Sequence, residues 1–326
     1  MRKVVCHAYG PLDQLTVEVH PDVEPGPGQV VVAVEAAGVN FVDALITQGR
    51  YQVKTPTPFT PGSELAGVVS AVGADVEGVT VGQRVLALPA NGGYASHAVV
   101  AAGSVIPIPD ALSAGQAAGI VQSYGTMHYA YTYRAPIQPG QWVAVLGAGG
   151  GIGLAAVDLA VAAGAQVVAC ASSEEKLTLA RSVGATATVN YEEPGVDLKA
   201  QLREITGGGA DMIADPIGGD KAESALRALR WEGRYLVLGF AAGDIPRFPI
   251  NQVLLNSRSL IGIEWGAWVM RGNRAANAAL IAEVLAMAAD GRIHPVEPTA
   301  RPLDDVAAAL TDLQQRRIAG KVVLTP

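Results

Sequence analysis

A cluster of glycines near the middle of the chain could bring backbone N–H groups against an anion. Ala148, Gly150 and Gly153 match the pattern A-x-G-x-x-G within VAVLGAGGGIGLAAVDLAVAAGA, which covers residues 143–165. Gly150 would let the backbone approach a pyrophosphate, and Gly153 would let the next helix pack closely on the preceding strand. Free N–H groups at the start of that helix would hold phosphate oxygens. A glycine-rich turn with no ligand is the alternative, so the surrounding elements must decide.

Hydroxyl groups and a cation follow about twenty residues later. In the stretch ACASSEEK, Ser172 and Ser173 stand where an NAD-binding chain carries an acidic residue for the ribose 2′-hydroxyl. Lys176 lies one turn into the next helix, and Tyr191 follows the third strand. A 2′-phosphate requires hydroxyl donors and a cation, so we expect NADPH over NADH, although two glutamates beside Lys176 count against a strong phosphate site. Ser173 could instead cap its helix, and Lys176 could simply be solvated.

The elements that would position these groups alternate between strands and helices. The sequence predicts strands over 143–146, 166–171, 187–190, 211–215, 234–240 and 259–263. It predicts helices over 173–184, 196–208 and 221–230. This alternation implies a parallel, doubly wound sheet, and the glycine turn follows its first strand. Since a dinucleotide fingerprint requires that context, we predict a nucleotide site on the turn.

The chain on either side of this region has a different pattern. The first 122 residues are β-rich, with short strands between Pro/Gly turns, and indicate a partly open barrel. After residue 264 come two helices and a final strand, too short a segment for a domain of its own. We therefore predict an α/β protein with domains 1–122 and 123–264 and a return segment 265–326 that completes the first domain.

Composition excludes several classes of partner. The 326 residues are 50% hydrophobic, enough for two ordinary cores. A net charge of −7, with no basic run longer than two residues, argues against nucleic acid. The two cysteines lie far apart and indicate neither a metal cluster nor a disulfide framework. No apolar run is typical of a signal peptide or a membrane span, so we expect a cytoplasmic protein.

Three segments resemble a known family: AAGVNFVDALITQGRY (36–51), PGSELAGVVSAVG (61–73) and AGKVVLTP (319–326). Together with the order of domains, they make the chain similar to the medium-chain dehydrogenase/reductases. Within that superfamily the chain resembles the zinc-free, zeta-crystallin-like quinone oxidoreductases, and the resemblance covers nearly its whole length. It implies a GroES-like N-terminal domain with an inserted doubly wound Rossmann domain, and NADPH as cofactor. The stretch SLIGIEWGAW (259–268) would form an edge of the sheet, and because exposed edges invite pairing we expect a homodimer.

Two positions depart from the zinc-dependent relatives. Those enzymes carry a cysteine where this chain has Asn40, and Gly-His-Glu where it has Gly62, Ser63 and Glu64. Their structural-zinc cysteines are absent, and Glu64 alone cannot hold a metal. We therefore expect no zinc, so the hydride acceptor must be polarised in another way or be reactive without a Lewis acid. Quinones and conjugated enones are such acceptors.

The resemblance also assigns residues to the reacting end. It places Tyr51 over the nicotinamide, Asn40 and Asp43 on the substrate side, and Thr126 within hydrogen-bonding reach of the nicotinamide. Water, Tyr51, or Asn40 acting through water could supply the proton. Asn40 could instead satisfy turn backbone, Asp43 could cap a helix that starts near Val42, and Tyr51 could be a core residue. The residues expected to bind the cofactor are Gly149, Gly150, Gly151, Ile152, Ser172, Lys176, Tyr191, Gly239, Phe240, Ala241, Trp265, Arg317 and Lys321.

Three functions remain open at this point. The leading one is an NADPH-dependent quinone or enone reductase. An enoyl-CoA reductase of the acryloyl-CoA type shares the scaffold and would need a basic surface for the CoA. The third is an NADPH-binding protein with little turnover.

Overall fold

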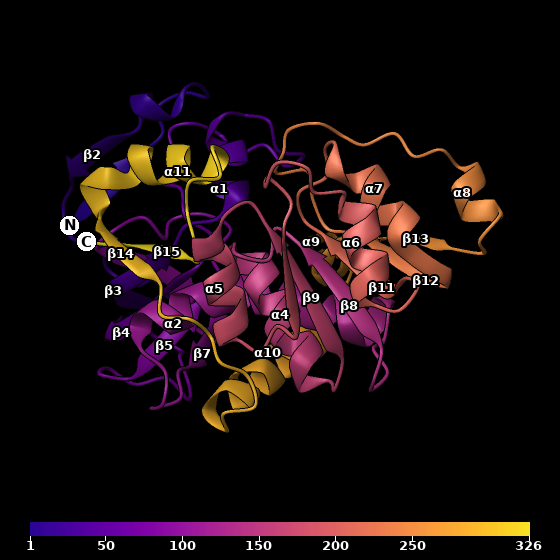
Figure 1. Cartoon of the computed structure of the whole chain (residues 1–326). Coiled ribbons are helices and arrows are strands. Elements are labelled where there is room, and N and C mark those ends of the chain that lie inside the picture. The colour runs from indigo at the N-terminus through magenta and orange to yellow at the C-terminus, as the bar shows by residue number, and fades with distance from the viewer. The chain divides into compact units, whose positions relative to one another are not determined.

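The chain folds into two compact units. The computed structural model describes all residues, 1–326. The first unit comprises Met1–Gln122 and Glu297–Pro326, and the second comprises Ser123–Val296 (Figure 1). Residues 265–296, which the sequence analysis assigned to the return segment, thus belong to the second unit.

A six-stranded sheet forms the centre of the second unit, in the order β10-β9-β8-β11-β12-β13, and all of its pairs are parallel. This is the 3-2-1-4-5-6 strand order of the Rossmann fold. Successive strands are added on one side of β8 as far as β10, and from β11 onward they are added on its other side. Runs such as WVAVL and QVVACA are apolar on both faces because helices cover both sides of a parallel sheet. The strands are β8 (Trp142–Leu146), β9 (Gln166–Ala171), β10 (Ala187–Asn190), β11 (Ala210–Asp215), β12 (Leu229–Val237) and β13 (Ser259–Gly262).

Eight α-helices belong to this unit, and the three that the sequence predicts are each shorter than expected. They are α3 (Thr126–Tyr129), α4 (Gly151–Ala162), α5 (Glu174–Ser182), α6 (Leu198–Ile205), α7 (Lys221–Ala228), α8 (Asn251–Leu254), α9 (Trp265–Met270) and α10 (Arg274–Ala289). The predicted helix 221–230 ends at Ala228, because the fully buried Leu229 already pairs with Ala210 in the sheet. Short π-helical segments, Val121–Gly125 and Ala130–Arg134, flank α3.

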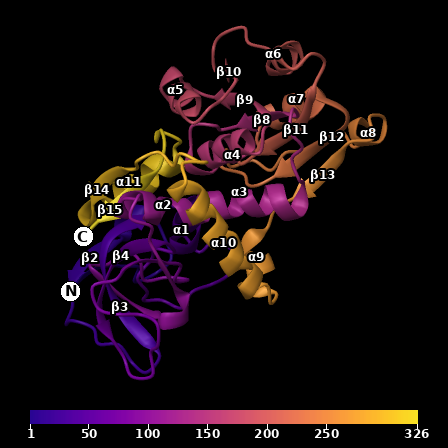
Figure 2. The same cartoon turned by 90° about the horizontal axis from the view of Figure 1, so that it is seen from below.

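Helices α9 and α10 lie with the second unit for a packing reason. The Trp265 indole donates a hydrogen bond to Asn277 Oδ1 at 2.9 Å, which joins α9 to α10. Helix α10 runs beside α3 (Figure 2) and buries Leu280, Ile281 and Val284. Their apolar side chains therefore complete the core of the unit that contains the nucleotide fingerprint. No helix of the protein has the length and apolar character needed to cross a membrane.

The first unit is a β-rich, GroES-like domain. Its main sheet has the order β14-β15-β3-β4-β5-β7, with β6 also paired to β3, while β1 and β2 form a separate pair. The strands are β1 (Arg2–Val5), β2 (Thr16–Val19), β3 (Gln29–Gly38), β4 (Leu65–Val72), β5 (Arg84–Ala87), β6 (His97–Ala101), β7 (Val105–Pro107), β14 (Thr299–Pro302) and β15 (Val322–Thr325). The helices are α1 (Phe41–Thr47), α2 (Ala114–Ile120) and α11 (Val306–Gln314).

The last strand places C-terminal residues beside the start of α1. In the antiparallel pair of β15 and β3, Val323 lies opposite Gly38 and Leu324 opposite Ala37. The yellow β15 in Figure 1 accordingly lies among the indigo and violet strands. Lys321, just before β15, is therefore brought next to Asn40, just after β3.

Candidate active site

The glycine turn joins β8 to α4, as the fingerprint predicts. Gly147 adopts a φ of +59°, and Gly150 occupies the N-cap position of α4 without a side-chain cap. A side chain at Gly153 would overlap the Gly147 carbonyl oxygen, so close packing of turn and helix requires glycine there. A methyl group at Gly150 would meet nothing nearer than the Gly147 oxygen at 3.7 Å. The turn is thus tightly packed behind Gly153 and open at Gly150, which suits an approaching pyrophosphate.

The predicted 2′-phosphate residues gather beside this turn. A side chain at Gly149 would overlap the Cβ of Lys176, so the turn and α5 are in contact. Lys176 Nζ donates to Ser172 Oγ at 3.1 Å. Ser173 is the N-cap of α5, accepting from the Lys176 N–H, so the capping role left open for it is the one the structure shows. Tyr191 N donates to Ala171 O at 3.1 Å, which holds the tyrosine at the end of β9.

A second cation lies near this cluster that the sequence analysis missed. Lys221 Nζ is 5.8 Å from the centre of the Tyr191 ring, within the range of a cation–π contact. Lys221 is the first residue of α7, and α6 and β11 separate α7 in the sequence from β10 and Tyr191. Nothing in the local sequence links it to Tyr191, because the contact depends on how α7 packs on the sheet.

The loops after β11 and β12 meet at the carboxyl ends of the strands. Ala241 N donates to Pro216 O at 3.3 Å, and a side chain at Gly218 would lie 3.0 Å from the Phe240 ring. The loop residues Gly239, Phe240 and Ala241 therefore lie at the carboxyl ends of the strands. Cofactors bind at this end of the sheet in open α/β folds. The buried Asp215 orders the first of these loops, a role that the sequence analysis did not foresee. It accepts hydrogen bonds from the Ile217 and Gly218 N–H groups and the Tyr235 hydroxyl.

Trp265 and the helix that carries Thr126 are neighbours. The indole is 9% exposed, and a side chain at Gly125 would lie 3.3 Å from its ring. Gly125 directly precedes Thr126, so the two predicted residues belong to one packed region of the second unit. Arg317 lies in the first unit, where its guanidinium is paired with Asp312 and Gln315. Tyr51 is half-buried in the same unit, with its N–H bonded to Leu45 O at 3.2 Å.

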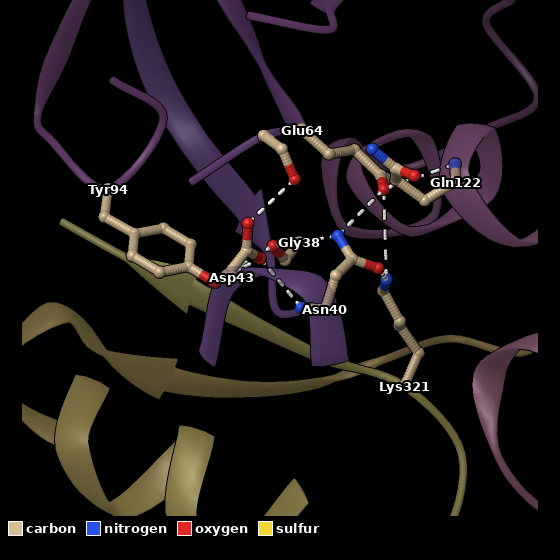
Figure 3. A network of polar contacts seen from close by, with 8 residues as sticks. Gly38, Asn40, Asp43, Glu64, Tyr94, Gln122 and Lys321 are labelled. Atoms are coloured by element: carbon tan, nitrogen blue, oxygen red, sulfur yellow. Dashed lines mark hydrogen bonds and ion pairs between the residues drawn. The ribbon is translucent and has the colours of Figure 1, made fainter. Parts of the chain in front are cut away.

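A buried carboxylate at the start of α1 holds three segments of the first unit together. Asp43 is 1% exposed, and its oxygens accept from Asn40 N at 3.0 Å, Ser63 Oγ at 2.8 Å and Tyr94 Oη at 2.8 Å. Burial raises the pKa of Asp43, whereas the hydrogen bonds from Tyr94 and Ser63 lower it. The helix cap that the sequence left open for Asp43 is present, since its carboxylate receives the N–H of Asn40, the N-cap of α1 (Figure 3).

Asn40 connects a second carboxylate to a lysine. Its amide Nδ2 donates to Glu64 Oε2 at 3.2 Å, and its Oδ1 accepts from Lys321 Nζ at 2.5 Å. Figure 3 shows Asn40 between the two charged side chains. The Lys321 ammonium lies 3.9 Å from Glu64 Oε2, outside hydrogen-bonding distance. The opposite charges at its two ends therefore fix the orientation of the Asn40 amide.

Only one of the two carboxylate oxygens of Glu64 accepts hydrogen bonds. Its Oε2 also accepts from the Gln122 N–H at 3.3 Å, whereas Oε1 is buried without a partner. Burial raises the pKa of Glu64 to about 6, while the nearby Lys321 charge acts in the opposite direction. The spacing of the sequence gave no sign of this network, because Lys321 lies 281 positions from Asn40.

The donor set in this region does not fit a zinc ion. Zinc sites in proteins use Cys, His or acidic ligands, whereas Asn40 and Ser63 are engaged with Lys321 and Asp43. Across the 326 residues, no group of three or more His, Cys, Asp or Glu side chains is arranged to hold a metal. By contrast, the glycine turn with Ser172 and Lys176 fits a dinucleotide phosphate.

Comparisons with known proteins agree with this architecture. Residues 26–110 match the alcohol dehydrogenase GroES-like domain family, and residues 151–284 match the family described as zinc-binding dehydrogenase. Quinone oxidoreductase-like protein 2 of Bos taurus is 38% identical over 92% of this chain and 85% of its own length.

Two solved structures extend the likeness to the whole fold. A probable oxidoreductase from Mycobacterium abscessus is 36% identical, with a TM-score of 0.86 over 100% of this chain and 99% of that one. The Escherichia coli quinone oxidoreductase complexed with NADPH is 27% identical, with a TM-score of 0.89 over the full length of both chains. With its GroES-like unit, its Rossmann unit and these full-length relatives, the chain belongs to the quinone oxidoreductase branch of the medium-chain dehydrogenase/reductases and is an oxidoreductase.

Proposed function

We propose that the protein is an NADPH-dependent reductase that transfers a hydride to a quinone or a conjugated enone without zinc. The observation that carries the proposal is the contact of the glycine turn with the stem of Lys176, whose ammonium is bonded to Ser172. One surface thus offers donors for both a pyrophosphate and a 2′-phosphate. The likeness to the NADPH-bound Escherichia coli enzyme supports the same cofactor here.

Bound NADPH supplies the hydride, so this chain's residues have to bind and orient it. We assign the pyrophosphate to the N–H groups of Gly149–Ile152, and the 2′-phosphate to Ser172, Lys176 and Tyr191. The residues assigned to the nicotinamide end are Gly239, Phe240, Ala241, Trp265 and Thr126. Arg317 stays a prediction for the cofactor, and its pairing with Asp312 would have to open.

Tyr51 and Asn40 are assigned to the acceptor, and Asp43 to their support. Asp43 has each of its oxygens occupied by a protein donor and is buried, so we propose that it positions Asn40 by capping α1. Asn40 is half-buried and held in one orientation by Glu64 and Lys321. A fixed amide of this kind can orient an acceptor for hydride transfer.

The proposal is tested by a panel of acceptors. NADPH oxidation is measured with a quinone, with an enone, with an enoyl-CoA and with no acceptor. Turnover with the quinone or the enone is the expected result. A rate with enoyl-CoA alone would favour the acryloyl-CoA-type reductase, and NADPH binding without turnover on any acceptor would favour the binding protein.

We expect turnover without a metal, because Asn40 and Ser63 are poor zinc ligands and already have protein partners. Metal analysis of the active enzyme should find no stoichiometric zinc, and treatment with a chelator should leave the rate unchanged. Loss of zinc together with loss of activity would contradict this part of the proposal.

A homodimer joined through the second unit remains part of the proposal. Strand β13 ends the six-stranded sheet, and Leu260 on it is 37% exposed, so its edge is open for pairing. A dimer mass at micromolar concentration is expected in solution, and a monomer mass would contradict it. A cytoplasmic location also remains a prediction, to be tested by fractionation of the producing cell.

A further inference from the structure

Lys321 in the first unit has an ammonium group that is fixed in place but does not use all of its N–H donors. The carbonyl of Lys321 accepts from Thr299 N at 2.9 Å, which anchors its backbone to β14. Its stem lies on α2, where a side chain at Gly119 would come within 3.1 Å of Lys321 Cγ. Its side chain is 11% exposed. The ammonium can therefore be reached only over a small area, in one orientation.

The ammonium of Lys321 has more N–H donors than it uses in hydrogen bonds to the protein. A lysine has three N–H donors, and Lys321 uses one of them, on Asn40 Oδ1. Glu64 Oε2 at 3.9 Å provides charge balance without taking a second donor. A lysine serving only as the ion-pair partner of Glu64 would bond to it directly, and the orphaned Glu64 Oε1 offers an acceptor for that purpose. The geometry instead turns the ammonium toward Asn40.

We propose that Lys321 is a catalytic residue, whose ammonium polarises the oxygen of the acceptor and gives it a proton. The proposal rests on the proposed function, with Asn40 beside the acceptor. It differs from the expectation that Lys321 binds the cofactor, and it names a donor other than water, Tyr51 or Asn40. A reductase without zinc needs another positively charged group to polarise the oxygen of the acceptor, and the Lys321 ammonium would be such a group.

The proton and electrons are accounted for with the groups named. A quinone gains the hydride, which carries two electrons, and then the proton released when one Nζ–H bond of Lys321 breaks and an O–H bond forms. The products are a hydroquinone and NADP⁺. The neutral amine regains its proton from water, and Glu64 stabilises the ammonium once it is restored.

The first experiment replaces the charge and varies the acceptor. For Lys321→Met, kcat/KM with a series of substituted 1,4-naphthoquinones should fall by about 100-fold or more, and the loss should grow as the quinone becomes less electrophilic. The dissociation constant of NADPH should change by less than about three-fold, because the phosphate donors lie elsewhere. The surface variant Lys199→Met, in an exposed part of α6, is the matched control.

The second experiment does not depend on turnover. In the NADP⁺-bound enzyme, 4-nitrophenol mimics the hydroquinone product, and its phenolate absorbance reports the pKa of the bound phenol. A cation within 4–6 Å lowers the pKa of an acid by about 1–3 units, so bound 4-nitrophenol should ionise at lower pH on the wild type than in solution. On Lys321→Met the pKa of the bound phenol should return to at least its solution value.

Folding is controlled with paired variants. Lys321→Met leaves Glu64 buried without a cation, so the double variant Lys321→Met with Glu64→Gln removes both charges together. The double variant should keep the melting temperature within a few degrees and still lose turnover. Lys321→Arg, which retains a cation, should recover part of the rate.

The outcomes separate this inference from the proposed function. If the wild type oxidises NADPH with no quinone or enone, the proposed function fails and the inference fails with it. If the wild type is active but Lys321→Met keeps its rate, loses the same factor with every quinone, or mainly weakens NADPH binding, only the inference is overturned. An unshifted pKa of 4-nitrophenol on the active wild type would also overturn it.

Discussion

Each unit has a polar cluster that contains a lysine, and the two clusters differ in the group that lies next to the ammonium. Around Lys176 in the second unit, the ammonium rests on a neutral hydroxyl, that of Ser172. Around Asn40 in the first unit, the Lys321 ammonium lies within 4 Å of the buried carboxylate of Glu64. The first arrangement places a lysine on a hydroxyl group next to the glycine turn, whereas the second places a lysine near a buried carboxylate. In the proposed function, the second unit binds the phosphates of the cofactor, while the first unit presents to the acceptor a cation that a buried carboxylate holds in place.

The largest expected effect breaks the buried network of the first unit. Asp43→Ala removes the acceptor of three donors, Asn40 N, Ser63 Oγ and Tyr94 Oη. The free energy of unfolding should fall by about 3–5 kcal/mol, because buried donors are left unpaired. Urea denaturation measures the loss. The exposed Asp13→Ala should cost less than about 0.5 kcal/mol, and equal losses for both variants would contradict the role given to Asp43.

The second prediction concerns Lys176 at the phosphate end. Lys176→Met should weaken NADPH binding by roughly 1–3 kcal/mol, the range for hydrogen bonds to charged groups, and leave NADH binding nearly unchanged. Titration calorimetry with both cofactors separates the effects, with Lys199→Met as the control. A similar loss for the two cofactors would show that Lys176 does not contact the 2′-phosphate.

The third prediction tests the charge of Glu64 through pH. Its pKa, about 6 in the folded protein, is above the ordinary value of 4.5. The folded state therefore binds this proton more tightly than the unfolded state, and its contribution to stability is present below about pH 4.5 and lost as the pH rises through 6. The difference amounts to about 2 kcal/mol. Glu64→Gln should remove it, so between pH 4.5 and 7 the variant should gain about that much in unfolding free energy relative to the wild type. Urea titrations of both proteins at the two pH values measure this gain, and parallel curves would contradict it.

The smallest expected effect lies at Tyr51. Tyr51→Ala should lower quinone turnover by about ten-fold through poorer orientation of the acceptor, while NADPH affinity changes little because the phosphates are held by other residues. Tyr51→Phe keeps the ring and serves as the control. Steady-state kinetics with the quinone varied, alongside cofactor titration, distinguish the two roles. Loss of NADPH binding in Tyr51→Ala would assign the ring to the cofactor instead.

The second unit could be predicted from sequence because its site is assembled locally. The expected strands 166–171 and 187–190 coincide with β9 and β10, since an apolar run ending in a turn leaves little choice of boundary. Ser172 and Lys176 are four positions apart on one strand–helix connection. The contact between Gly149 and Lys176 follows from the same right-handed β-α-β unit.

The β-rich, GroES-like fold of the first unit was predicted, but its polar network was not, because that network is assembled from distant segments. Asp43, Ser63 and Tyr94 come from three separate stretches, and Lys321 from a fourth. No periodicity connects an amide after β3 with an ammonium before β15, because their contact depends on the register of the β15–β3 pair. The resemblance identified Asn40 and Asp43 as residues of interest, but it associated Lys321 with the cofactor. The network between them had to come from the fold.

The return of β15 to β3 sets an order of events during synthesis. The whole second unit, Ser123–Val296, is translated before β15 leaves the ribosome. At about 5–20 residues per second, the nascent first unit waits on the order of ten seconds. During this time the end of β3 at Ala37 and Gly38 lacks its partner β15, and Glu64 lacks its cation. An unpaired edge is a place where chains associate wrongly, so chaperone binding should concentrate in this interval. The arrival of Lys321 and β15 then pairs this end of β3 and supplies the charge in one event. The network of Asn40, Glu64 and Lys321 is therefore completed only in a chain that already carries its second unit.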